Sequence, residues 1–137
     1  MSHFSTIKTE IKNKDHLVSA LKQMGYSVKT GNYQCRGYRG NTESVEILIE
    51  NAGSGYDMGF RNNDGNYELV ADWYGIDGVN SDQLVKNIQS EITKIENKIK
   101  QEYAYNTVKE KLLDQGFEID EELREGGEIR IKLSRIG

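Results

Sequence analysis

The stretch YDMGFRNNDGNYELVADWYG, residues 56–75, predicts a β-hairpin, and this hairpin decides the fold class. Asp64-Gly65 is a dipeptide typical of two-residue hairpin turns. With that turn Arg61 faces Glu68, and the side chains alternate between an apolar, aromatic face and a polar face. A four-residue loop ending at Gly65 would shift the pairing by two residues and leave the two faces unchanged. The pattern therefore indicates two strands of an antiparallel sheet.

The polar face of this hairpin brings Asp57 opposite Asp72. Two carboxylates that face each other across a strand pair repel unless an arginine, a bound cation or a retained proton compensates them. Arg36 and Arg39, in the segment CRGYRGN, are the available arginines. We expect Arg36, with Arg39 as second choice, to lie between the aspartates as a brace. The alternative is a site for a small ligand or a hard cation such as magnesium, or an enzyme site, formed by Asp57, Glu68 and Asp72.

Hydrophobic periodicity and glycine positions predict the remaining elements of the N-terminal two thirds. A short helix is expected to begin at Asn13 or Asp15 and to end at Gly25, a residue suited to a left-handed helix stop. Four further strands are expected, over 4–11, 26–29, 33–38 and 44–50.

Residues 81–115 contain neither glycine nor proline and carry an aliphatic stripe at helical spacing, namely Val85, Ile88, Ile92, Ile95 and Ile99. One helix over this span would run about 50 Å at 1.5 Å per residue. Because that is long for a small domain, we expect a kink near residues 100–106. The stripe either covers the sheet or, as the alternative, forms the seam of a homodimer through the 85–99 helix.

A second hairpin is predicted at the C-terminus, where Ile129, Ile131 and Leu133 alternate with polar residues. A loop over residues 124–128 would set Ile119 opposite Leu133 and Leu123 opposite Ile129. Apolar and opposite-charge pairs then coincide, which favours that register.

Length and composition predict a single α+β domain over residues 1–137, in which a short N-terminal helix and a long, kinked C-terminal helical region pack on an antiparallel sheet. The net charge of −4 does not favour nucleic-acid binding. Cys35 is the only cysteine, which excludes an intramolecular disulfide and a cysteine-based zinc site. No apolar run is long enough for a membrane span. We predict a cytoplasmic protein without cofactor or metal.

The sequence shows no nucleophile elbow and no glycine-rich phosphate loop. Aromatic residues are abundant, and with arginine they commonly anchor protein interfaces, although they also fill cores. These aromatics are Tyr33, Tyr38, Tyr56, Tyr67, Trp73, Tyr74, Tyr103 and Tyr105. We therefore predict a non-enzymatic protein-binding or adaptor domain. The candidate binding residues are Arg36, Tyr38, Arg39, Tyr56, Asp57, Tyr67, Glu68, Asp72, Trp73, Tyr103 and Tyr105.

Six short motifs occur together and in order: MSHFSTIKT (1–9), RGYRGN (36–41), YDMGF (56–60), YELVADWYG (67–75), YAYNTV (103–108) and QGF (115–117). In these motifs, which span nearly its whole length, the chain resembles the conserved hypothetical chloroplast reading frame thirty-five family of plastids, cyanobacteria and other bacteria. The resemblance implies a cytosolic or stromal protein without a membrane segment or an established activity. It also implies association with an AAA-type ATPase, because family members are often encoded near one. Glu102 stands where the family pattern leads us to expect an arginine.

Overall fold

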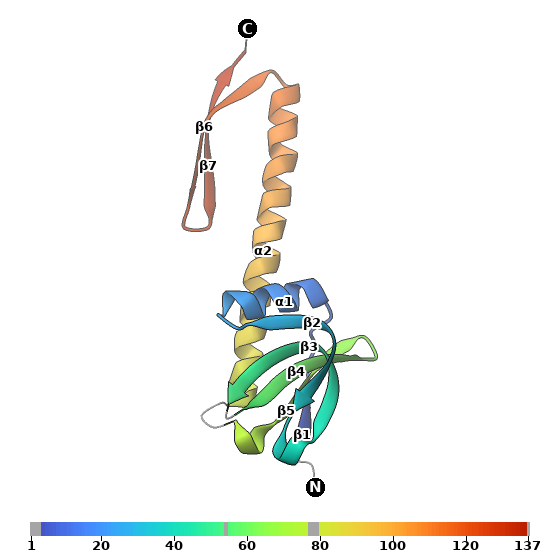
Figure 1. Ribbon diagram of the computed structural model, residues 1–137. Coiled ribbons are helices and arrows are strands. Elements are labelled where there is room, and N and C mark those ends of the chain that lie inside the picture. Colours follow the sequence, from blue (N-terminus) through green and yellow to red (C-terminus); the bar gives the residue numbers. More distant parts are fainter. Residues whose placement is uncertain (1–3, 54, 77–79, 137) are drawn as a thin grey trace. The chain divides into compact units, whose positions relative to one another are not determined.

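The computed structural model describes residues 4–53, 55–76 and 80–136, with the side chain of Tyr74 outside the description (Figure 1). The elements are, in chain order, β1 (Phe4–Lys8), α1 (Lys14–Gln23), β2 (Val28–Arg36), the 3₁₀ turn η1 (Tyr38–Gly40), β3 (Thr42–Gly53), β4 (Tyr56–Asn63), β5 (Asn66–Asp72), the 3₁₀ turn η2 (Trp73–Gly75), α2 (Ser81–Asp114), β6 (Phe117–Glu125) and β7 (Glu128–Arg135). The predicted α+β class is confirmed. Contacts group the chain into two compact units, Met1–Ile95 and Glu96–Gly137. The single domain predicted for residues 1–137 stays a prediction.

The first unit is built on a five-stranded antiparallel sheet in the order β1-β5-β4-β3-β2. The hairpin β4–β5 has the predicted register, with Arg61 opposite Glu68. Asp64 and Gly65 both have positive φ, 58° and 94°, as a two-residue turn of type I′ requires. The two strands predicted at 26–29 and 33–38 are one strand, β2, because a bulge between Thr30 and Tyr33 absorbs the irregular Gly-Asn segment without ending the pairing.

One face of this sheet is covered by α1 and the first turns of α2. Asn13 caps α1 by accepting a hydrogen bond from the backbone N–H of His16, at 3.0 Å. The shared core consists of Leu17, Ala20 and Leu21 from α1, Leu84, Ile88 and Ile92 from α2, and sheet residues that include Ile47, Phe60 and Leu69. The aliphatic stripe of α2 therefore covers the sheet as far as Ile92, as the first interpretation of its spacing predicted.

The other face of the sheet carries a smaller cluster, which consists of Cys35, Val45, Leu48 and Val70 with Phe4 and Tyr33 packed against it. This cluster is buried because the sheet is strongly curved (Figure 1). The Sγ atom of Cys35 in β2 lies 3.3 Å from the carbonyl oxygen of Asp57 in β4, although β3 separates these strands in the sheet order. The end of β2 thus folds across β4 and covers the sheet's own second face.

The second unit contains the C-terminal half of α2 and the hairpin β6–β7. Helix α2 is uninterrupted from Ser81 to Asp114. The prediction of a kink near residues 100–106 is therefore wrong, because the helix does not break there. No glycine or proline in the span forces one. In the part of the chain that the structure describes, no helix has the length and apolarity needed to cross a membrane.

The predicted register of the C-terminal hairpin is partly wrong. The turn is the two-residue Gly126-Gly127 pair, with φ of 59° and 80°, so Leu123 pairs with Arg130 rather than with Ile129. A bulge between Ile119 and Glu121 then restores the predicted pair of Ile119 with Leu133. A five-residue loop was expected because two glycines among charged residues are typical of loops. Two consecutive glycines with a left-handed backbone also suit a tight two-residue turn, which is what forms here.

Candidate functional site

Residues Gly37–Asn41 join β2 to β3 at the curved end of the sheet, and we call this segment the β2–β3 loop. It is closed by two backbone hydrogen bonds, from Gly37 N–H to Asn41 O at 2.8 Å and from Asn41 N–H to Tyr38 O at 3.0 Å. Arg39 has φ 52° and ψ 39°, a left-handed backbone that is uncommon for a residue with a side chain. Gly40 follows with φ 76°. These bonds and angles define one compact conformation of the loop.

Asp57, at the start of β4, anchors the strand that leads into this loop. Its carboxylate accepts the Nε–H and backbone N–H of Arg36 at Oδ2, both at 2.9 Å. Its Oδ1 accepts Nη2–H of Arg36 at 2.9 Å and the backbone N–H of Asn51 at 3.0 Å. The side chain of Asp57 is buried, whereas that of Arg36 is about half exposed, at 49%. Four donors thus fill about the four lone-pair positions that a carboxylate offers.

Burial and hydrogen bonding act on the Asp57 carboxyl in opposite directions. Burial raises its pKa, but the hydrogen bonds from the Arg36 side chain and from the backbone of Arg36 and Asn51 together outweigh burial. The pKa of Asp57 therefore lies below its usual range, and the group is a carboxylate at neutral pH.

Asp72, at the end of β5, anchors the loop itself. It is fully buried, and its Oδ2 accepts the backbone N–H of Tyr38 at 2.8 Å. Gly37 makes this approach possible, since a Cβ at that position would lie 2.6 Å from Cζ of Phe4 and 2.9 Å from Cβ of Asp72. The predicted brace by Arg36 is therefore confirmed at Asp57, and Asp72 accepts the backbone N–H of Tyr38 in the loop.

Glu68 lies on the same sheet face but belongs to a different group of contacts. Its Oε1 accepts Nδ2–H of Asn63 at 2.6 Å, and its Oε2 lies 3.4 Å from Nε of Arg61. The hydrogen bond from Asn63 is the main cause of the lowered pKa of Glu68; burial opposes it and Arg61 adds to it. Asp57 and Glu68 are thus held by different partners. With its oxygens occupied by four donors, Asp57 offers no position to a cation.

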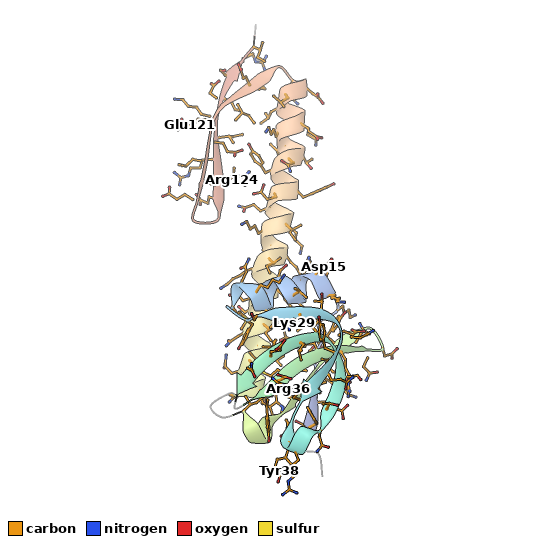
Figure 2. The ribbon with its side chains drawn as sticks, in the orientation of Figure 1. Asp15, Lys29, Arg36, Tyr38, Glu121 and Arg124 are labelled. Carbon is orange, nitrogen blue, oxygen red and sulfur yellow. The ribbon has the colours of Figure 1, made fainter. Side chains whose placement is uncertain are left out.

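The outer side of the β2–β3 loop presents two of the predicted binding residues. Arg39 is exposed and Tyr38 half-buried, and Cζ of Arg39 lies 5.2 Å from the centroid of the Tyr38 ring. Figure 2 shows Tyr38 at this end of the sheet, with Arg36 above it in the view. The loop therefore exposes an arginine–tyrosine pair on a backbone that a buried carboxylate holds.

The other candidate residues lie elsewhere. Tyr67 is buried in the core, and Tyr56 and Trp73 are half-buried against it, so these three fill the core. Tyr103 and Tyr105 are in the second unit, where Tyr103 is exposed and the Tyr105 ring lies 5.2 Å from Cζ of Arg124.

Sequence reasoning did not identify Asn51, which supports the Arg36–Asp57 pair twice. Its backbone N–H reaches Asp57, and its Oδ1 accepts Nη2–H of Arg36 at 2.9 Å. Asn51 has φ 53°, and asparagine is one of the few residues that tolerate a left-handed backbone. An asparagine in the segment ENAGSG, between two predicted strands, was the one available signal. Cys35, next to the pair, is buried, and burial raises the pKa of its thiol to about 12.

Comparison with known proteins gives one family. Residues 20–132 match the family model described as "Protein of unknown function (DUF1257)". Three curated relatives, each named "Uncharacterized protein ycf35", align over 98% of this chain and 98% of their own length. They come from Guillardia theta, at 32% identity, Cyanophora paradoxa, at 28%, and Pyropia yezoensis, at 30%. No solved structure matches the chain.

Proposed function

The chain belongs to the ycf35 family, proteins of unknown function, and we propose that it acts as a non-enzymatic domain that binds a protein partner through the β2–β3 loop. The observation that carries this proposal is the way the loop is held. Asp72 is buried beneath it and fixes the N–H of Tyr38, while Asp57 fixes the strand that enters it. A loop ordered in advance loses little conformational entropy when it binds.

The exposed chemistry of the loop supports a protein as the ligand. Tyrosine and arginine are the residues that most often dominate the energy of protein interfaces. Arg39 is exposed above Tyr38, which suits a partner surface that offers a carboxylate to the guanidinium and an apolar contact to the ring. The resemblance makes an AAA-type ATPase the first partner to test. The same proposal places the domain in the cytoplasm, or in the stroma of a plastid, without a cofactor.

The test measures binding of the full-length chain to a purified AAA-type ATPase encoded in the same genome. Arg39→Asn removes the guanidinium and keeps a residue that accepts the left-handed backbone. We expect this variant to bind at least about tenfold more weakly, as the loss of an interface anchor predicts. The matched control is Arg135→Ala, which removes another arginine stacked on an aromatic ring, 4.6 Å from Phe117, in the second unit.

Equal loss of affinity in both variants would contradict a loop-centred site. If neither the ATPase nor a native lysate yields a reproducible partner, the protein-binding proposal fails as a whole.

A further inference from the structure

A polar pocket lies beside the β4–β5 turn, at the opposite end of β5 from Asp72 and the β2–β3 loop. It is lined by Lys8, Thr9, Asn63, Asp64, Asn66 and Glu68, and we call it the Glu68 pocket. Its volume is about 280 Å³. Pockets for drug-sized molecules are usually about 300–1,000 Å³, so this volume suits a smaller ligand.

Hydrogen bonds within the protein hold the walls of the Glu68 pocket. On one side, Oγ1 of Thr9 donates to the carbonyl oxygen of Tyr67 at 2.6 Å and accepts the backbone N–H of Ile11 at 3.1 Å. On the other side, Oδ1 of Asn62 accepts the backbone N–H of Gly65 at 3.0 Å, within the turn that forms this wall. A ligand therefore enters a pocket that is already shaped, and little of the chain has to be ordered on binding.

The carboxylate of Glu68 is the buried charge of the pocket, at 6% exposure, and it keeps room for a further donor. It accepts hydrogen bonds from Asn63 and Arg61, whereas a carboxylate offers about four lone-pair positions. This differs from Asp57, whose positions are filled by four donors. Lys8 is the Cα partner of Glu68 across β1 and β5, yet it forms no ion pair with any residue that the structure describes.

A metal ion does not suit this set of side chains. The pocket contributes two carboxylates, Glu68 and Asp64. In the described ranges of the chain, no three His, Cys, Asp or Glu side chains come together as metal ligands. Magnesium and calcium take about six or more oxygen ligands, and the ammonium group of Lys8 would repel them. An ammonium group, with one charge and three N–H donors, needs fewer acceptors.

We propose that the Glu68 pocket binds a small zwitterion, a free polar α-amino acid. The α-ammonium group of the ligand donates to Glu68, and its α-carboxylate pairs with Lys8. The buried acid of the pocket and its one base thus each meet an opposite charge. Asp64, the third charge of the lining, favours a ligand side chain that donates a hydrogen bond, such as the hydroxyl group of serine.

The test is an NMR titration of the isotope-labelled full-length chain with serine and two blocked forms of serine. N-acetylserine keeps the carboxylate and loses the ammonium group, whereas serinamide keeps the ammonium group and loses the carboxylate. We expect serine to shift the amide signals of the pocket residues with a dissociation constant of about 1 mM or lower. Each blocked form should bind at least about tenfold more weakly, because it leaves one charge of the pocket unmatched.

Two variants assign the two contacts. Glu68→Gln keeps the shape of the side chain and removes its charge, so serine and serinamide should both bind at least about tenfold more weakly. Lys8→Gln should weaken serine and leave serinamide unchanged, because serinamide has no carboxylate for Lys8 to meet. Lys8 is exposed, so this variant remains informative even if Glu68→Gln fails to fold. The matched control is Lys22→Gln, an exposed lysine on α1, which covers the other face of the sheet.

Serinamide that binds as tightly as serine would overturn the zwitterion and indicate the amino terminus of a peptide instead. N-acetylserine that binds as tightly as serine would overturn the role of Glu68. If serine, threonine and asparagine all leave the pocket signals unchanged at about 20 mM, the pocket holds water only and the proposal fails. Because Arg39→Asn leaves this pocket intact, failure of the partner proposal would not change serine binding.

Discussion

Replacing Asp57 by asparagine tests the anchoring of β2 most directly. The substitution keeps the size of the side chain and removes the charge that receives four donors from Arg36 and Asn51. An amide has only one acceptor oxygen. In the variant, the amide NH₂ group would take the place of one carboxylate oxygen and would face the N–H donors that this oxygen accepts in the wild type.

The expected loss follows from these contacts. Hydrogen bonds to a charged group contribute about 1.5–3 kcal/mol each, and a buried donor left unsatisfied costs about 1–3 kcal/mol. Because part of the network faces solvent and can recruit water, we expect Asp57→Asn to lower the free energy of unfolding by about 2–4 kcal/mol. Urea unfolding followed by circular dichroism measures it. The control is Asp64→Asn in the Asp-Gly turn, where asparagine suits the same backbone and the change should be within about 0.5 kcal/mol.

The stability that Asp57 contributes depends on pH in a direction that its pKa predicts. The folded-state pKa of Asp57 lies below that of the unfolded chain, which is about 3.9 for aspartate. The stability contributed by ionised Asp57 is therefore fully present above that value and is lost as the pH falls through the lower, folded pKa. The difference between wild type and Asp57→Asn should shrink on acidification from neutral pH.

The double mutant with Arg36→Ala completes the cycle. Arg36 and Asp57 are in direct contact, so we expect a coupling free energy of about 1 kcal/mol or more. Asp72→Asn combined with Arg36→Ala should be closer to additive, because Asp72 binds the backbone of Tyr38. Strict additivity of the Arg36–Asp57 cycle, or a difference that grows on acidification, would refute the reasoning.

Three further predictions concern packing and reactivity. Gly37→Ala should destabilise the fold by about 1–3 kcal/mol in urea unfolding, because the added methyl group would overlap Phe4. Ile92→Asp should unfold the first unit, seen as loss of helical circular dichroism, since it buries an unpaired charge in the core. Cys35 should resist a thiol reagent at pH 8 in the native protein and react fully in denaturant, because burial raises its pKa to about 12; rapid native labelling would contradict the buried environment.

The sequence predicts best where local backbone chemistry and side-chain alternation agree. In the hairpin of residues 56–75, the Asp-Gly turn permits few geometries, and each register shift of one residue would expose the apolar face. The same reasoning failed in β2, because the Gly31-Asn32 pair reads as a break between strands while the backbone accommodates it as a bulge.

The candidate site was predictable only in its charged part. Facing aspartates require compensation, and Arg36 provides it for Asp57 as charge reasoning expects. Asp72 accepts a backbone N–H, which every residue except proline carries, so no residue type marks this contact in a sequence. The role of Gly37 depends on the approach of Phe4 from a distant strand, and local patterns do not report such contacts.

The end of β2 at Arg36, where the β2–β3 loop begins, affects how the edge of the sheet can pair with another chain. β2 is an edge strand, and edge strands present N–H and C=O groups that can template pairing with another chain. At this end the N–H group of Arg36, and that of Tyr38 in the loop that follows, are already bonded to the carboxylates of Asp57 and Asp72. Neither N–H group is therefore available to a foreign strand, and we expect this end of the sheet to resist edge-to-edge pairing.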